Sequence, residues 1–519
     1  MRKILTLLFF AAVLPLPAAD LERHVVLVVW DGMRPDFVNV TNTPTLYSLA
    51  NRGVFFAHHH PVYVSSTEVN GTALATGDYP EHSGVIGNRE YRPEIDPLES
   101  FATESLEAML KADSHGSYLG ASTFTEILQQ QGYQTAIAGT KSVVLLDDHA
   151  TRPGGATNVV LYEGHALPTN ALPRFVHALG PFRDQGDTKT NRDIWTTRSL
   201  TELIWTNNDM PAFSLLWLAE PDNTQHATGV GSAQSVAAIR NSDFALSRLV
   251  AELKVKGVYD TTDIFVVSDH GFSTISTNVN MVARLRRAGF KVFRQFEGPP
   301  ARGDVVLIGL GGSALLYVTG HDEKTIDGIV KFLQTDDSVG TIFTSRARPG
   351  TFALEEAMIH SSEAPDIVVS FRWNSAVNEN GAPGFIVSES QGSNLTAITQ
   401  KATHASLSPS DMHNTLVAVG PDFRQGYVDQ TPSGNVDVAP TILKILGVKP
   451  PRPMDGRVLS EALNSSETAV PKIEAKELRA QATLPNGEWT QTLKISEVNG
   501  VRYLDEGSGQ FTPKATVKQ

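Results

Sequence analysis

Acidic and imidazole side chains follow three apolar stretches of this chain, at positions where they could hold metal ions. Each stretch, at 24–30, 212–218 and 263–267, ends within a few residues of an aspartate. The sequence contains no cysteine, so a zinc-type ion would need histidine, carboxylate or hydroxyl ligands. Three carboxylates and three imidazoles suit two divalent ions, and the candidate ligands are Asp31, Asp222, His226, Asp269, His270 and, later in the chain, His404.

A hydroxyl group at the start of a predicted helix is the candidate nucleophile. Ser66 and Thr67 precede the helical segment 69–75, and the free N–H groups and positive dipole end of a helix favour bound phosphate. Coordination of a metal ion would lower the pKa of such a hydroxyl and activate it. The same residues could instead cap the helix, which is their usual role, and these physical arguments alone do not choose between the two.

The elements that must position these residues predict an α/β fold. The apolar runs are rich in β-branched residues, as expected for strands covered on both faces, and helical patterns such as 233–254 lie between them. Strands that alternate with helices predict a mostly parallel sheet with helices on both faces. Because ligand-binding groups gather beyond the carboxyl ends of parallel strands, we expect Asp31, Asp222 and Asp269 to meet at one edge of the sheet.

Changes of pattern along the 519 residues divide the chain into segments. Between about 279 and 401, short strands, turns and several Gly and Pro residues indicate a smaller inserted cap region. Asn499-Gly500 between two apolar runs is typical of a hairpin turn. We expect a signal peptide at 1–19, a catalytic core at 20–278 and 402–463, the cap region at 279–401, and a C-terminal appendage with a hairpin at 464–519.

Charge and the N-terminal sequence bear on partners and location. The net charge of −13 argues against a nucleic-acid duplex as partner, which requires a basic face, but it allows an anionic substrate at a site that binds cations. Arg2 and Lys3 precede the apolar run 4–16, which predicts a secretory signal. That run is short for a membrane span, so we expect an exported protein, periplasmic or secreted, without a transmembrane anchor. The oligomeric state stays open.

Motifs in a fixed order run through most of the chain from Val25 to Leu463. They include Trp30-Asp31-Gly32, Ser66-Thr67-Glu68-Val69-Asn70, Glu220-Pro221-Asp222, Ser268-Asp269-His270-Gly271 and Thr403-His404. This ordered set resembles the nucleotide pyrophosphatase/phosphodiesterase family, the type I phosphodiesterases of the alkaline phosphatase superfamily. The resemblance implies an alkaline-phosphatase-like core and hydrolysis of phosphodiester or pyrophosphate bonds in small, nucleotide-like or other phosphate esters.

The resemblance also implies roles for individual residues. Thr67 would attack phosphorus and form a phospho-threonine intermediate, which water then hydrolyses. Asn70 would donate a hydrogen bond to a phosphoryl oxygen, where negative charge develops. One ion would be held by Asp31, Thr67, Asp269 and His270, and the other by Asp222, His226 and His404, with zinc as the expected metal.

The chain departs from the family pattern in three places. Glu68-Val69 stands where Phe-Pro is usual after the nucleophile, and Gly71 replaces a common histidine. Ala405 follows His404 where glycine is usual. These departures concern the pocket rim and the local backbone, so they bear on the substrate more than on the metal ligands.

Several alternatives accompany this interpretation. A phosphomonoesterase would need a cationic group for the extra charge of its substrate, and the sequence places none. A sulfatase would need a Cys/Ser-x-Pro-x-Arg motif, which residues 67–70 do not supply. From another class, a non-catalytic, metal-dependent periplasmic binding protein would keep the ligands without turnover.

Other histidines could also bind metal. His413 could compete with His404 for the second ion, and the triplet 58–60 is expected to be exposed or at a strand end rather than metal-binding.

Overall fold

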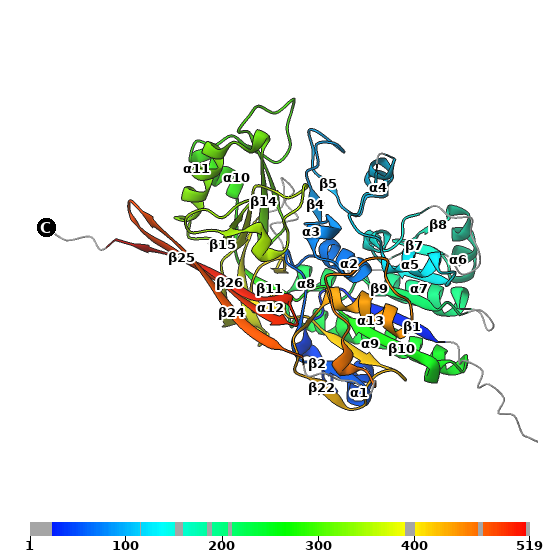
Figure 1. Cartoon of the computed structure of the whole chain (residues 1–519). Coiled ribbons are helices and arrows are strands. Elements are labelled where there is room, and N and C mark those ends of the chain that lie inside the picture. Colours follow the sequence, from blue (N-terminus) through cyan, green and yellow to red (C-terminus); the bar gives the residue numbers. More distant parts are fainter. Residues whose placement is uncertain are drawn as a thin grey trace, which may run out of the picture.

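A computed structural model describes residues 23–114, 116–150, 159–183, 189–205, 210–389, 400–464 and 471–514. The expected signal peptide at 1–19 lies outside these residues. The described part of the chain forms a large sheet flanked by helices, a second lobe built on smaller sheets, and a long three-stranded sheet near the C-terminus (Figure 1).

Three parallel strands at the centre of the large sheet precede the candidate metal ligands. β1 (His24–Trp30) pairs in parallel with β9 (Phe213–Leu218) on one side and with β10 (Thr262–Val267) on the other. Antiparallel pairs occur toward both edges of the sheet. The pairs at its centre are parallel, so the predicted α/β class with a mostly parallel sheet is confirmed. The strand order is β22 (Tyr427–Asp429), β2 (Val54–Phe56), β21 (Leu416–Val419), β10, β1, β9, β6 (Thr135–Gly139), β7 (Val160–Tyr162) and β8 (His165–Leu167).

Alternate residues of β1 enter two different hydrophobic cores, one on each face of the sheet. Leu27 and Val29 belong to a core with residues of α2 (Thr67–Thr76), α5 (Phe124–Gln130) and α13 (Val438–Ile445). Val28 and Trp30 belong to the opposite core, with residues of α1 (Pro44–Arg52) and α9 (Ala233–Val255). A strand whose two sides are both buried needs a continuous apolar run, which explains the sequence of β1.

The second lobe contains a six-stranded and a four-stranded sheet. The first and last strands of this lobe lie side by side, because β11 (Ser273–Val279) pairs antiparallel with β20 (Ala402–Thr403). The helices α10 (Met281–Arg287) and α11 (Glu323–Leu333) belong to this lobe. The six-stranded order is β12 (Val292–Phe293), β13 (Val305–Gly309), β14 (Ser313–Val318), β17 (Ile367–Phe371), β15 (Val339–Thr344), β16 (Phe352–Ala353), and the four-stranded order is β18 (Trp373–Val377), β19 (Pro383–Glu389), β11, β20.

The C-terminal sheet packs against this second lobe. It consists of β24 (Ile473–Leu484), β25 (Gly487–Val498) and β26 (Val501–Pro513), and the turn between the last two is Asn499-Gly500 with φ values of 52° and 94°. The Gln491 side chain hydrogen-bonds both the N–H and the carbonyl of Ile342 at 3.0 Å. The appendage is therefore fixed to the lobe by backbone recognition as well as by apolar burial.

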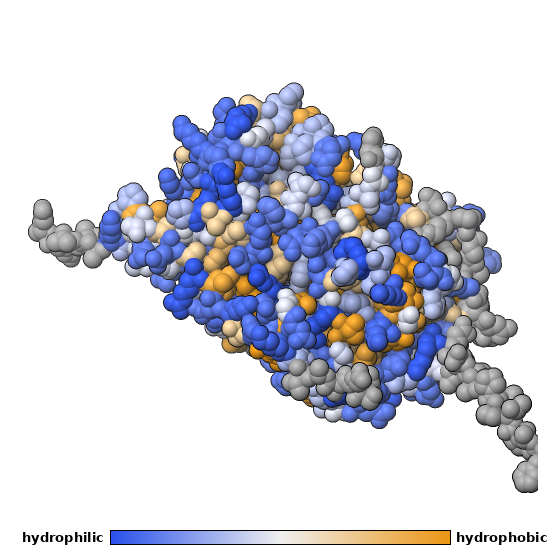
Figure 2. All heavy atoms as spheres, viewed as in Figure 1, coloured by the Kyte–Doolittle hydropathy of each residue, from blue (hydrophilic) through white to orange (hydrophobic). Residues whose placement is uncertain are grey.

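The face of the molecule shown in Figure 2 is mainly hydrophilic, with hydrophobic residues in scattered groups. Among the described residues, no helix combines the length and the apolar composition needed to cross a membrane.

Helix α2 lies unusually close to its neighbours at Gly71. A Cβ atom at this position would lie 2.6 Å from Cγ2 of Val143 and 3.4 Å from the Trp217 ring. The histidine that is common here in the family would therefore not fit this chain.

We expect Gly71→Ala to lower the free energy of unfolding by about 1–3 kcal/mol, because overpacking a close contact outweighs the better helix propensity of alanine. Urea unfolding measures the change. Gly298→Ala is the matched control, since a Cβ there meets no atom within 4 Å. A Gly71→Ala protein more stable than wild type would contradict the close packing of α2.

Candidate active site and metal centre

Asp31, Asp222 and Asp269 each use one carboxylate oxygen within the protein and leave the other unpaired. Lys141 Nζ lies 2.8 Å from Asp31 Oδ2 and 2.7 Å from Asp222 Oδ2. The backbone N–H of Gly32 donates to Asp269 Oδ1 at 2.9 Å. The other oxygens, Asp31 Oδ1, Asp222 Oδ1 and Asp269 Oδ2, are buried without a hydrogen-bond partner among the described residues. Since unpaired buried polar groups are costly, these oxygens favour cations beside them.

Three imidazoles face these oxygens, and all three are oriented in the same way. The Nδ1 atom of each ring lies 2.8–3.0 Å from a backbone carbonyl oxygen. A carbonyl oxygen accepts a hydrogen bond and cannot donate one, so Nδ1 carries a proton, and in the neutral ring Nε2 keeps its lone pair. Histidines that ligate metals usually donate their other N–H in this way. The pairs are His226 with Ala402, His270 with Gly271, and His404 with Ser65.

The six side chains form two adjacent groups, each suited to one divalent ion. Within a group, the ligand atoms lie within 4.8 Å of one another. His270 Nε2 lies 3.2 Å from Asp269 Oδ2, and in the other group His226 Nε2 lies 3.2 Å from Asp222 Oδ1. The first group is Asp31, Asp269 and His270, and the second is Asp222, His226 and His404.

The electrostatics of this cluster also favour added positive charge. Burial, followed by the nearby Asp269 carboxylate, raises the pKa of Asp31 to about 8. The pKa of Asp269 is raised to about 7, mainly by burial. The pKa of Asp222 is instead held well below its usual range: burial opposes this shift, but the neighbouring Lys141 and His226 outweigh it. Cations that replace Lys141 as the compensating charge would allow all three carboxylates to ionise.

Thr67 is the first residue of α2 and lies beside the first group. Its Oγ1 lies 3.2 Å from His270 Nε2. Ser66 is the N-cap residue of this helix, yet no side chain makes a capping hydrogen bond there. The alternative that Ser66 or Thr67 serves to cap α2 therefore has no support, and Thr67 presents its hydroxyl to the metal groups at the positive end of the helix dipole.

The turns that deliver the ligands have special backbone requirements. Gly32 adopts φ of 69° directly after Asp31, which favours glycine. Gly271 is required for a different reason, because a Cβ there would lie 2.1 Å from the carbonyl oxygen of Ser410. Ala405 has φ of 77°, a left-handed conformation that costs an L-residue roughly 1–2 kcal/mol. This explains why glycine is usual after His404 and shows that alanine keeps the same turn.

Asn70 does not have the role that was expected of it. Its side chain is fully buried, and Nδ2 donates to the carbonyls of Val62 and Ser66 at 3.1 and 3.0 Å. Its Oδ1 accepts from the N–H of Val62 and from Asn435 Nδ2. Because these hydrogen bonds occupy the whole amide, it cannot also bind a phosphoryl oxygen. Asn435 Nδ2 also donates to the carbonyl of Asp269 at 2.7 Å, so Asn70 instead positions α2 relative to the metal ligands.

The pocket over the two groups includes two residues that the sequence analysis missed. It has a volume of about 380 Å³, and Asn88 and Lys141 line it together with Thr67. Asn88 Oδ1 accepts from the N–H of Glu68 at 3.3 Å, which leaves its Nδ2 without a partner among the described residues and able to donate to a ligand. Lys141 follows β6, a neighbour of β9, so the rule that ligand groups follow parallel strands could have identified it.

The histidines of uncertain role lie away from this pocket. His413 does not join His404, and it is instead close to His60 and Asp505. His59 is buried, with its ring nitrogens 2.9 Å from Ser433 Oγ and Asn435 Oδ1. The expectation of a strand end holds for part of the triplet, because His59 and His60 form the short strand β3 (His59–His60).

Several known proteins are similar to this chain in sequence or in fold. The chain is 22% identical over 453 residues to rat ectonucleotide pyrophosphatase/phosphodiesterase family member 7, covering 86% of this chain and 89% of the relative. It is 23% identical to bis(5'-adenosyl)-triphosphatase enpp4 of Xenopus laevis, covering 83% and 79%. Human ectonucleotide pyrophosphatase/phosphodiesterase 5 has a similar fold, with a TM-score of 0.58 at 18% identity over 85% of this chain and 100% of that one. Its murine counterpart, solved as an inactive threonine-to-alanine variant with AMP, matches equally well.

The sequence pattern of one family covers most of the chain. The family described as "Type I phosphodiesterase / nucleotide pyrophosphatase" matches residues 25–404, a range that contains Thr67 and all six side chains of the two active-site groups. The protein therefore belongs to the type I phosphodiesterase/nucleotide pyrophosphatase family and is a hydrolase of phosphodiester or pyrophosphate bonds.

Proposed function

We propose that this protein is an exported phosphodiesterase or nucleotide pyrophosphatase that acts through Thr67 with two divalent ions of the zinc type. The observation that carries the proposal is the set of three unpaired carboxylate oxygens and three oriented imidazoles beside the Thr67 hydroxyl. Such a donor set fits zinc-type ions rather than magnesium or calcium, which prefer oxygen ligands throughout. Export is proposed from the N-terminal sequence pattern and from relatives whose names mark them as ectoenzymes.

Each residue of the site has a defined task in this reaction. Thr67 Oγ1 forms the new bond to phosphorus while the bond to the leaving oxygen breaks, and water then cleaves the phospho-threonine. The N-terminus of α2 and the Asn88 amide offer donors to the phosphoryl oxygens. When bound, the two ions would lower the pKa of the Thr67 hydroxyl and offset charge on the attacking and leaving oxygens.

The lining of the pocket favours a polar leaving group. None of its described residues carries an aromatic ring other than imidazole, and Glu68 occupies the position after the nucleophile. Burial, and then the Glu104 carboxylate, raise the pKa of Glu68 well above its usual range. These residues offer no aromatic face on which a nucleobase could stack, and we propose that polar phosphodiesters other than nucleotides are also substrates.

A phosphomonoesterase remains the second candidate, because one observation favours it. No cation near the site could be identified from the sequence, but Lys141, Lys189 and Arg192 all line the pocket. A lysine displaced from Asp31 and Asp222 by bound ions would be available to the additional charge of a monoester.

We expect the metal-loaded enzyme to hydrolyse bis-p-nitrophenyl phosphate with a kcat/KM at least roughly tenfold above that for the mono-ester, since a diester matches the family chemistry. Release of p-nitrophenol measures both rates. Lys141→Met should lower the rate on the mono-ester more than on the diester, because it removes charge that the diester needs less. A wild-type enzyme that prefers the mono-ester would support the second candidate instead.

Thr67→Ala should reduce turnover of the diester by at least about 1,000-fold, as removal of a nucleophile does elsewhere, while bound zinc stays near the wild-type amount. Ser66→Ala is the matched control, because it removes the neighbouring hydroxyl, which has no hydrogen-bond partner among the described residues. Mass spectrometry of rapidly quenched wild-type protein should find phosphate on Thr67. Retained turnover in Thr67→Ala would refute nucleophilic catalysis by this residue.

A further inference from the structure

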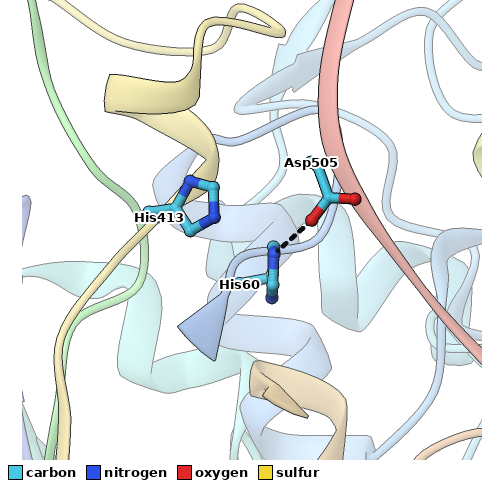
Figure 3. A group of neighbouring side chains, drawn as sticks. All are labelled: His60, His413 and Asp505. Carbon is cyan, nitrogen blue, oxygen red and sulfur yellow. Dashed lines mark hydrogen bonds and ion pairs between the residues drawn. The ribbon is translucent and has the colours of Figure 1, made fainter. Parts of the chain in front are cut away.

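His60, His413 and Asp505 form a third group of potential metal ligands, outside the active site. One ligand atom from each lies within 4.8 Å of those from the other two. The three residues come from distant parts of the chain: β3, the segment directly after α12 (Pro409–Met412), and β26 of the C-terminal sheet. Figure 3 shows the three side chains converging, with a nitrogen of His413 on the side of its ring that faces His60 and Asp505.

The hydrogen bonds of the two imidazoles fix their tautomers. His60 Nδ1 lies 3.0 Å from the carbonyl oxygen of Ser433, and His413 Nδ1 lies 3.0 Å from that of Pro409. Because carbonyl oxygens only accept, both Nδ1 atoms must carry protons, and the neutral rings keep a lone pair on Nε2. This arrangement, in which the far nitrogen donates to the backbone, is the one found around metal-bound histidines.

The His60–Asp505 contact leaves two possibilities. His60 Nε2 lies 2.9 Å from Asp505 Oδ1, so in a neutral ring a lone pair would face a carboxylate oxygen. With Asp505 ionised, either His60 carries a second proton or a cation lies between the two atoms. The second possibility also accounts for His413, whose Nε2 has no hydrogen-bond partner among the described residues although the ring is packed 4.7 Å from that of His60.

We propose that His60, His413 and Asp505 bind a third divalent ion, of the zinc type, which fastens the C-terminal sheet to the catalytic core. Two imidazole nitrogens and one carboxylate oxygen are a zinc ligand set, with water in the fourth position. Tetrahedral zinc would separate the His60 and Asp505 ligand atoms to about 3.4 Å, a shift of a few tenths of an ångström from their present distance. The Asp505 side chain is 25% exposed, which gives the ion a route from solvent.

The position of this site suggests its purpose. His60 lies shortly before Thr67 in the sequence, and His413 shortly after His404. Tyr503, two residues before Asp505, stacks on His60 and donates to Asp437 at 2.7 Å. An ion at this junction would hold together the segments that lead into the nucleophile and out of the second metal group, so it acts as a structural ion and takes no part in the reaction.

A similar-looking group elsewhere does not have these features. Asp78, His82 and Asp455 also lie close together, but Arg452 donates to both oxygens of Asp78, at 3.1 and 2.6 Å. The guanidinium already supplies the compensating charge, and the His82 side chain is 54% exposed. This second group therefore provides a matched control.

The test is a zinc titration of chelator-stripped full-length protein, with bound metal counted by mass spectrometry after desalting. Wild type should bind one equivalent more than His413→Gln, which keeps the His60–Asp505 contact, and His82→Gln should bind as many as wild type. Added zinc should raise the Tm of wild type, and the Tm of His413→Gln should rise less. Should His413→Gln fail to fold, Asp505→Asn replaces it, with the same loss of one equivalent expected.

Equal zinc stoichiometry in wild type and His413→Gln would overturn the proposal. A Tm that falls in Asp505→Asn but not in His413→Gln, with no dependence on zinc, would identify His60 and Asp505 as a simple ion pair and would also overturn it. Loss of the extra equivalent in His82→Gln instead would assign the ion to the other group.

Discussion

The rest of the active site depends on the crowding of three buried carboxylates at one edge of the central sheet. Parallel strands bring Asp31, Asp222 and Asp269 together, and each keeps one oxygen without a partner among the described residues. Such an arrangement is unfavourable unless positive charge lies among the oxygens. Lys141 supplies some of that charge, and two divalent ions would supply more while exposing a lysine to the substrate.

This constraint explains why so much of the surrounding structure is devoted to fixing side chains. Backbone carbonyls orient the three imidazoles, and the Asn70–Asn435 pair connects the start of α2 to the backbone at Asp269. Gly71 allows α2 to approach Val143 and Trp217, so the helix that carries Thr67 and the segment that carries Lys141 form adjoining walls of one pocket. Small displacements of these walls would separate the hydroxyl from the ligands, and pre-organisation of this kind is what phosphoryl transfer requires.

The central sheet was predictable because its strands have a strong local signal. A strand covered on both faces needs a continuous apolar run, and ligands follow the carboxyl ends of such strands. The strand order of the second lobe was not predictable, since its short strands pair over long distances in the sequence, as β14 does with β17. The role expected of Asn70 came from its resemblance to a family asparagine, and such a match does not show that the hydrogen bonds of the amide are already used. Lys141 was not predicted, because a lysine is not a zinc ligand and its role here is to balance the charge of Asp31 and Asp222. The contact of His60 with His413 and Asp505 brings together three distant segments of the chain, so no local sequence pattern predicts it.

Anomalous diffraction at the zinc edge, from crystals of the zinc-loaded protein, would locate the ions among the three active-site carboxylates. We expect two strong peaks in the active site, one among Asp31, Asp269 and His270 and one among Asp222, His226 and His404, with Lys141 Nζ moved away from both aspartates. Zinc-loaded crystals without a peak in either group, in which Lys141 still contacts Asp31 and Asp222, would contradict this expectation.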